Sequence, residues 1–407
     1  MIVRFRRGTA ALMLICAALT GMIAFTMLSA ISPIFAQSDA AFAFATNTPQ
    51  ANTQSQTDTN PPPTVIESNG GAFDPTVCAP FTDGGELSPE CLAIIEANPR
   101  PLVNQVPLDA YTIDTYSFWR VGRDATPTYD APGGNLIGEI PAGFNFVNAI
   151  NTNVEGWLQI QGGQWIERNR ATYAQPSFFR GVTLQSDTVL PFAFVLDLSR
   201  IPVSRYPGGE RDNSTGRFLQ RYELVNIFAT AYDEEGWRWY MIGPNQWVEQ
   251  RFVAKVQRIE RPEGISGQWI AVDLYEQTLV AYQDDTPVYA TLISSGLERT
   301  ETNEGLFNVW ARLPSDGMSG ATGAPNAYAL QSVPWVMYFD GSISLHGTYW
   351  HDLFGYRQSR GCVNLTISDA RWVFEWTGQG EPDAEGNIST PVYVYSSGEY
   401  GVTASGL

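Results

Sequence analysis

Short stretches of alternating hydrophobic and polar residues, separated by glycine, proline, asparagine and aspartate, run through most of the chain after residue 107. Alternation with a period of two is typical of strands with one buried face, and the separating residues are typical of turns. The sequence therefore predicts a mainly β protein. One segment, ISDARWVFEWTG, has helical spacing instead, so we expect a short helix with Ser368 as its N-cap and Gly378 after its end.

Two β-rich stretches in the middle of the chain repeat one another. Their aligned residues are Pro132 with Pro207, Trp157 with Trp237 and Trp165 with Trp247. A glycine–tryptophan strand followed by a glutamine–tryptophan strand resembles bacterial SH3-like modules, which implies two small β-barrels, module 1 (residues 108–175) and module 2 (residues 190–258). Tryptophans in small barrels more often fill the core than bind a ligand. We therefore expect spacers, with ligand binding as the alternative.

Longer strands follow from about residue 267. VDLYEQTLVAYQDDTPVYATLISSG predicts a hairpin with the polar turn QDDT, and two more strands flank the turn at Asp340 and Gly341. Between them, the glycine- and serine-rich segment ARLPSDGMSGATGAPNAYALQS predicts a long loop, a candidate flap over a site. We assign residues 267–396 to a third, β-rich domain and residues 397–407 to a tail.

The first 75 residues have a different composition. Three arginines in the first seven residues precede an apolar run over residues 9–31, a pattern that directs export. Residues 1–36 are therefore either a cleaved signal peptide or, as the length of the run slightly favours, a membrane anchor. Residues 37–75 are rich in serine, threonine, asparagine, glutamine and proline, which predicts a disordered linker. The rest of the chain is expected outside the cytoplasm.

Composition and charge narrow the function. The chain has 407 residues, and 44% of them are hydrophobic against 16% charged, which is typical of a globular protein with more than one core. Its 42 acidic and 24 basic side chains give a formal net charge of −18. Such a charge repels nucleic acid, so no nucleic-acid partner is expected.

The four cysteines differ in their surroundings. Cys16 lies in the apolar run, and Cys78 and Cys91 frame a short segment within residues 76–107, where an oxidising compartment favours a local disulfide. Cys362 is then left as a lone thiol. A lone cysteine is more often a small buried hydrophobic residue than a reactive one, so its neighbours decide its interpretation.

Those neighbours include both histidines of the chain, within SLHGTYWHDLFGYRQSRGCVNL. His346 precedes Cys362 by 16 residues (362 − 346), enough for two neighbouring strand ends joined by a loop. An imidazole beside a thiol can remove its proton and produce a thiolate nucleophile. Gly361 would let backbone N–H groups approach a developing oxyanion, so the pattern favours acyl transfer.

This stretch resembles the signature of the L,D-transpeptidase (YkuD-like) catalytic domain family, which is a histidine, a spacer, then Ser-His-Gly-Cys, an apolar residue and Asn or Arg. VDLYEQTL, ISSG, NEGLF and VPWVMYF also resemble this family, in the expected order, over residues 267–396. The resemblance implies a β-rich domain with a short helix after the catalytic cysteine. It implies Cys362 as nucleophile, His346 as general base, the Gly347 carbonyl as the group that orients the imidazole, and Gly361 with Cys362 as oxyanion donors.

The resemblance also suggests substrate-binding residues. Ser359 and Asn364 match positions that shape the loop, Trp350 matches an aromatic residue beside the acyl pocket, and Tyr338 and His351 are expected to be substrate-facing or, for His351, structural. Arg360 stands where the family has its second histidine. An arginine there would favour the thiolate or hold a substrate carboxylate.

The implied function is peptidoglycan cross-linking at the cell wall. Cys362 would attack the third residue of a stem tetrapeptide, release the terminal D-alanine, and pass the acyl group to a side-chain amine of another stem. Transfer to water, which would make an L,D-carboxypeptidase, and non-catalytic wall binding remain alternatives. HGTYWHD is not a standard zinc spacing, so we expect no metal and no cofactor. The expected partners are peptidoglycan stem peptides, and we expect a monomer.

Overall fold

The structure is a computed structural model that describes residues 77–78, 86–196, 200–210, 215–321, 324, 326–380 and 388–398. The predicted export segment and linker over residues 1–75, and most of the predicted tail, lie outside these residues. The chain divides into residues 1–50 and residues 51–407, and everything described below belongs to the second unit. No helix in the described part has the length and apolar character needed to cross a membrane.

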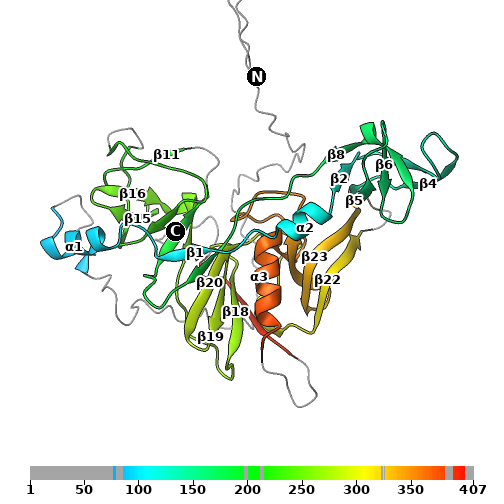
Figure 1. The fold of residues 1–407 in the computed structure, drawn as a ribbon. Coiled ribbons are helices and arrows are strands. Elements are labelled where there is room, and N and C mark those ends of the chain that lie inside the picture. The colour runs from blue at the N-terminus through cyan, green and yellow to red at the C-terminus, as the bar shows by residue number, and fades with distance from the viewer. Residues whose placement is uncertain are drawn as a thin grey trace, which may run out of the picture. The chain divides into compact units, whose positions relative to one another are not determined.

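Strands dominate the described chain, as the alternation predicted (Figure 1). Its α-helices are α1 Pro89–Ala97, α2 Ala110–Thr115 and α3 Ile367–Thr377. Cys91 in α1 forms the predicted disulfide with Cys78, and both side chains are fully buried. They share a hydrophobic cluster with Trp239 and Trp247.

Module 1 folds as one open sheet. Its elements are β2 Phe118–Val121, β3 Thr126–Tyr129, β4 Leu136–Ile140, β5 Phe144–Asn151, β6 Trp157–Ile160, β7 Trp165–Glu167, the 3₁₀ helix η3 Arg168–Arg170 and β8 Ala171–Tyr173. Antiparallel pairing joins β8, β2, β5, β6, β7, β3 and β4 in that order. Among the described strands β4 pairs only with β3, so the predicted closed barrel is not shown.

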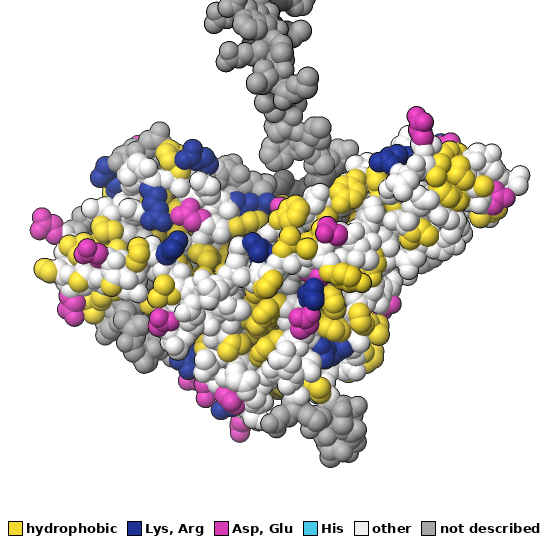
Figure 2. Space-filling model, in the orientation of Figure 1, with side chains coloured by type: hydrophobic (Ala, Val, Ile, Leu, Met, Phe, Trp, Pro, Cys, Tyr) yellow, Lys and Arg dark blue, Asp and Glu magenta, His cyan; other side chains and the backbone are white. Residues whose placement is uncertain are grey.

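Exposed hydrophobic side chains gather at this open end. Leu136 and Ile137 in β4 are 66% and 53% exposed. Figure 2 shows hydrophobic side chains grouped over this part of the face, whereas acidic and basic side chains are spread more singly elsewhere. The unpaired end of the sheet is therefore also apolar.

Module 2 has one strand more than module 1 and forms different sheets. Its elements are β10 Phe192–Val195, β11 Ile201–Pro202, β12 Phe218–Leu219, β13 Leu224–Asn226, β14 Ala229–Tyr232, β15 Arg238–Gly243, β16 Gln246–Glu249, the 3₁₀ helix η5 Gln250–Phe252 and β17 Val253–Val256. The sheets are β13-β10-β17, β14-β15-β16 and β11-β12, and none of them closes among the described residues. In both modules a tryptophan-bearing hairpin leads into a 3₁₀ helix and one more strand.

A seven-stranded sheet forms the first layer of the C-terminal part, in the order β1-β9-β20-β19-β18-β26-β21. Its strands are β1 Val103–Gln105, β9 Val182–Leu184, β18 Gln268–Asp273, β19 Thr278–Gln283, β20 Thr286–Leu292, β21 Gly305–Asn308 and β26 Pro391–Tyr395. Asp284 has a positive φ of 52° in the predicted polar turn between β19 and β20. β1 and β9 precede residue 190, so the N-terminal half of the chain completes this sheet.

The second layer contains β22 Ala311–Gly320, β23 Tyr328–Asp340, β24 Ile343–Thr348 and β25 Val363–Thr366. β22 and β23 form a long antiparallel hairpin, so the prediction of a loop here is wrong. Glycine and serine suggested a loop, but pairing between the two strands supplies the backbone hydrogen bonds that the segment needs. At its start β23 also pairs in parallel with β5 of module 1, where Tyr328 lies opposite Phe144.

Helix α3 packs between these layers (Figure 1): Ala370 and Val373 join one hydrophobic cluster with residues of both sheets. The N-cap lies two residues earlier than we expected. Thr366 is the N-cap, and its Oγ1 accepts a hydrogen bond from the Asp369 N–H at 3.1 Å. Ser368 is not the cap because its hydroxyl accepts a hydrogen bond from the Asp109 N–H, at 3.0 Å, instead. Gly378 is the C-cap, as predicted.

Candidate active site

The predicted base lies on β24, and the predicted nucleophile directly precedes the neighbouring parallel strand, β25. β24 and β25 pair Leu345 with Val363 and His346 with Asn364. Cys362 directly precedes β25, so it lies one position before the first of these pairs. The parallel register therefore places Cys362 opposite Ser344, two positions before the pair of His346 with Asn364, although Cys362 follows His346 by 16 positions in the sequence (362 − 346).

The His346 side chain is buried and oriented by the backbone. Its Nδ1 lies 3.2 Å from the Gly347 carbonyl oxygen, and its residue is 1% exposed. A carbonyl only accepts hydrogen bonds, so Nδ1 carries the proton of the neutral ring and Nε2 is left unprotonated. Burial lowers the pKa of His346 to about 4. The ring is therefore neutral at pH 7 and has a nitrogen able to accept a proton.

Cys362 is a free, partly exposed thiol. Burial raises its pKa, while hydrogen bonds from the backbone and the side chain of Ser344 lower it. Its Sγ lies 3.7 Å from Ser344 Oγ and 4.0 Å from the Ser342 carbonyl oxygen. The sequence interpretation missed Ser344. Residues two apart on a strand share a face, which would have placed Ser344 beside His346.

The loop before Cys362 is held in one conformation. Ser359 Oγ donates to the Cys362 carbonyl at 2.5 Å and accepts from the Gly361 N–H at 3.2 Å. Gly361 has a φ of 113°, which L side chains rarely adopt, and its carbonyl accepts from Thr302 Oγ1 at 2.8 Å. Of the two predicted oxyanion donors, Gly361 is thus already engaged with Ser359 in the free protein.

Arg360 is directed towards the β22–β23 hairpin. Its guanidinium donates to the Asn326 carbonyl at 2.5 Å and lies 4.8 Å from the centre of the Tyr328 ring. Tyr338, on the same hairpin, pairs in register with Ser344 and donates to Asp316 Oδ2 at 2.9 Å. Burial, Asp316 and the nearby Cys362 raise the pKa of Tyr338 to about 12. The hairpin therefore lies beside the thiol, where we expected a flap.

His351 is fully engaged with the protein. Its Nδ1 accepts a hydrogen bond from the Leu353 N–H at 3.2 Å, and its Nε2 lies 2.9 Å from the side-chain amide of Asn364. The Asn364 atom at 2.9 Å is Nδ2; a neutral ring that accepts at Nδ1 carries its proton on Nε2, so this hydrogen bond requires the Asn364 amide to be turned with Oδ1 towards the ring. Burial, then the charges of His346 and Arg221, lower the pKa of His351 to about 3.

Trp350 connects the two histidines. Its ring centre lies 5.5 Å from that of His346 and 6.4 Å from that of His351. The neighbouring Tyr349 is fully buried and stacks on Phe118 of module 1 at 3.7 Å. Tyr349 also donates from its hydroxyl to the Gln331 carbonyl of β23 at 2.6 Å. Module 1 thus packs against the residues that support the site, a contact that treating the modules as separate units had missed.

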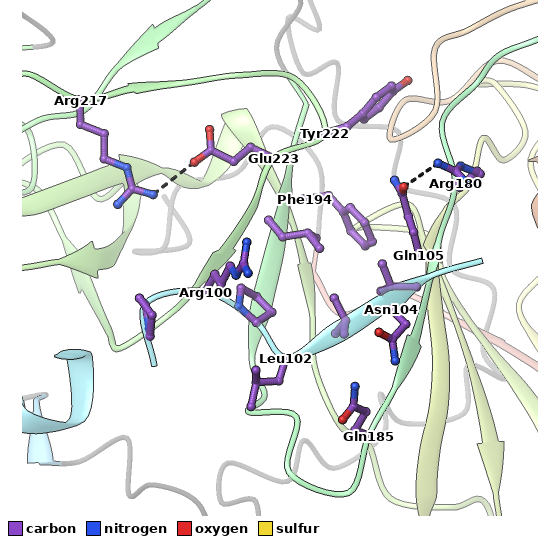
Figure 3. Close-up of a pocket in the computed structure, with 15 residues that line it drawn as sticks. Arg100, Leu102, Asn104, Gln105, Arg180, Gln185, Phe194, Arg217, Tyr222 and Glu223 are labelled. Atoms are coloured by element: carbon purple, nitrogen blue, oxygen red, sulfur yellow. Dashed lines mark hydrogen bonds and ion pairs between the residues drawn. The ribbon is translucent and has the colours of Figure 1, made fainter. Parts of the chain in front are cut away.

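A cavity of about 750 Å³ lies away from these residues, beside β1, β9, β10 and β13 (Figure 3). Two of the three arginines that line it have partners within the protein: Arg217 pairs with Glu223 at 3.3 Å and Arg180 donates to Gln105 at 2.7 Å. None of the predicted site residues lines it. Across the described ranges, no three His, Cys, Asp or Glu side chains gather as a metal site.

Comparison with known proteins identifies the C-terminal part. Residues 267–394 match the YkuD family, the L,D-transpeptidase catalytic domain. The candidate L,D-transpeptidase YciB of Bacillus subtilis is 28% identical over 121 residues, which cover 26% of this chain and 59% of YciB. The chain therefore spans somewhat less than two thirds of this curated relative.

Two solved structures are also similar. A mutant of the Enterococcus faecium L,D-transpeptidase is 29% identical, with 32% of this chain and 50% of that chain covered and a TM-score of 0.28. The catalytic domain from E. faecium L,D-transpeptidase is 25% identical, with 32% of this chain and 99% of that chain covered and a TM-score of 0.27. The family match at residues 267–394 confirms the predicted catalytic domain, and the SH3-like modules stay a prediction.

Proposed function

We propose that the chain is a cell-wall L,D-transpeptidase that forms peptidoglycan cross-links through a thioester on Cys362. The observation that carries the proposal is the register of β24 and β25, in which the neutral His346 ring lies two positions along the neighbouring strand from Cys362, on the strand face that Ser344 shares. The Gly347 carbonyl fixes the Nδ1–H tautomer, so Nε2 is available as the general base.

The reaction has two acyl-transfer steps. His346 Nε2 takes the Cys362 proton as the sulfur attacks the carbonyl of the third residue of a stem tetrapeptide. The amide bond to the terminal D-alanine then breaks, and the amine of D-alanine departs with the proton that His346 had taken. The rest of the stem stays attached to Cys362 as an acyl thioester. A side-chain amine of a second stem then attacks the thioester, gives its proton to His346, and releases the Cys362 sulfur with the new amide bond formed.

The oxyanion of each step would be held by backbone N–H groups of Cys362 and Gly361. Gly361 would exchange its hydrogen bond to Ser359 Oγ for one to the oxyanion, which keeps its donor satisfied in both states. Trp350, Tyr338 and Arg360 would line the acyl site: Tyr338 is near Cys362, Trp350 contacts the His346 ring, and Arg360 extends from the loop before Cys362 to the hairpin.

The remaining expectations complete this proposal. Residues 1–36 would export the chain or anchor it through residues 9–31, and the folded part would act as a monomer on stem peptides outside the cytoplasm. The matching element order around Trp157 and Trp237 supports two modules of SH3-like ancestry. Hydrolysis of the thioester by water, giving an L,D-carboxypeptidase, uses the same residues and is distinguished by the product.

Intact-protein mass spectrometry tests the nucleophile. A carbapenem should add once to the wild-type chain and not to Cys362→Ala, with peptide mapping placing the adduct on Cys362. An adduct that persists in Cys362→Ala contradicts the assignment. Incubation with a tetrapeptide and an acceptor amine then separates the activities: a cross-linked product supports transfer, whereas a tripeptide alone supports the carboxypeptidase.

A further inference from the structure

Ser344 brings a hydroxyl group to the reactive sulfur. Its Oγ lies 3.7 Å from Cys362 Sγ, and the residue is 0% exposed. We infer that the Ser344 hydroxyl donates a hydrogen bond to the Cys362 sulfur and stabilises the thiolate during acyl transfer. The inference rests on the proposed function for its role in catalysis, whereas the hydrogen bond itself is measurable on the free protein.

The fold gives this hydroxyl its direction. Leu345 pairs with Val363 in the parallel register of β24 and β25. Ser344 and Cys362 each precede one of these paired residues, so they lie opposite one another. Side chains alternate along a strand, so Ser344 and His346 lie on the same face of β24. The base and the hydroxyl therefore both reach the face of the sheet where the sulfur lies. A buried hydroxyl is costly unless it has a hydrogen-bond partner, and Sγ is within reach.

The charges around the sulfur explain why a neutral donor matters here. A thiolate is commonly stabilised by a nearby cation. His346 is buried and neutral at pH 7, and the Arg360 guanidinium is occupied by the Asn326 carbonyl and the Tyr328 ring. Ser344 supplies both a backbone and a side-chain hydrogen bond that favour the charged sulfur. These two donors compensate in part for burial of the thiol.

The role of Ser344 differs from that of His346. The proton leaves Sγ for His346 Nε2, and the Ser344 hydroxyl keeps its own proton while its hydrogen bond to sulfur strengthens. When the thioester forms, the negative charge moves from sulfur to the substrate oxygen and this hydrogen bond weakens. Ser344 therefore lowers the cost of forming the nucleophile and is not itself a base.

Titration of the Cys362 thiol tests the inference without a substrate. Full-length variants are alkylated with iodoacetamide across a pH series, and mass spectrometry follows the peptide that contains Cys362. Hydrogen bonds to charged groups predict that Ser344→Ala raises the alkylation midpoint by about one pH unit. The matched pair Ser344→Thr and Ser344→Val has nearly the same shape and differs in the hydroxyl, so Val should shift the midpoint and Thr should not.

Ser342→Ala is the control, because it removes an exposed hydroxyl in the turn directly before β24 while keeping its carbonyl; its midpoint should equal that of the wild type. Thermal unfolding of each variant confirms that the folded chain is being titrated. Equal midpoints for Thr and Val, or a shift as large in Ser342→Ala, would overturn the inference. A shifted midpoint in a chain that transfers no acyl group would reject the proposed function and leave the hydrogen bond standing.

Discussion

Removing residues 1–261 should unfold the catalytic part, although the family match begins only at residue 267. Strand β9 pairs with β20, and β5 pairs with β23, so the truncated chain would lose a partner strand in each sheet. The Asp369 carboxylate would also lose the Gly181 N–H, which donates to it at 2.7 Å. Asp369 is buried, so the loss leaves part of a buried polar group without a partner.

The larger cost is in the core. Trp269, Tyr282, Leu292 and Phe354 are each 0% exposed and share one hydrophobic cluster with phenylalanines and valines from before residue 262. Fully exposing a large buried side chain costs about 2 kcal/mol, so exposing the four costs at most about 8 kcal/mol. A domain is stable by only about 5–15 kcal/mol. The truncated chain therefore loses most or all of its free energy of unfolding.

Urea unfolding followed by tryptophan fluorescence measures this loss. A chain that starts at residue 262 should show no cooperative transition and should not react with a carbapenem at Cys362. A chain that starts at residue 76, which keeps every described strand, is the control and should show both. If the short chain unfolds cooperatively within about 2 kcal/mol of the control and still forms the adduct, the modules are spacers and the reasoning fails.

Three further predictions concern the site. His346→Ala should abolish acyl transfer, whereas His351→Ala should leave an appreciable fraction of kcat, because both ring nitrogens of His351 already have partners within the protein. Equal and complete loss of activity in a steady-state assay would show that the role of general base is assigned to the wrong histidine. The free energy of unfolding should fall by about 1.4 kcal/mol per pH unit for each histidine as the pH drops below about 6.5, because the unfolded chain binds protons there, whereas the native His346 and His351 rings stay neutral down to about pH 4 and pH 3. Urea titrations on His351→Ala should show a shallower fall with pH, and an unchanged slope would contradict this dependence on histidine protonation. Arg360→His should leave the alkylation midpoint of Cys362 unchanged and raise KM, because the Arg360 guanidinium contacts the backbone carbonyl of Asn326 in the hairpin and not the sulfur. A large shift of the midpoint would instead indicate that Arg360 lies beside the thiolate.

Local sequence patterns were sufficient for the elements that local chemistry decides. The Cys78–Cys91 disulfide, the hairpin around Asp284 and the end of α3 at Gly378 follow from spacing and turn residues. The family motif was likewise specific enough to predict the catalytic domain. The spacing of 16 positions between His346 and Cys362 is compatible with a connection between parallel strands, because such a pair needs a connection of about a dozen residues or more.

What the sequence did not reveal depends on distant partners. Thr366 and Ser368 are equally plausible caps by local rules, and the choice follows from Asp109, whose N–H occupies the Ser368 hydroxyl from 259 residues away. The segment before β23 looked like a loop because nothing in its own residues indicates the strand across from it. Ser344 was passed over because its significance comes from the register of β25, which alternation alone does not specify.

The pairing of β5 with β23 also affects when the protein can finish folding during its synthesis. The Asn148 N–H donates to the side chain of Gln331, which is 183 residues further along the chain. This contact cannot form until the later segment has been synthesised. Synthesis proceeds from the N-terminus, and contacts this distant in sequence close slowly. A nascent chain therefore carries β9 without β20 and module 1 without its hairpin for most of its emergence. Cys362 therefore has all of its neighbouring elements only after nearly the whole polypeptide has been synthesised, so we expect prematurely terminated chains to lack acyl-transfer activity.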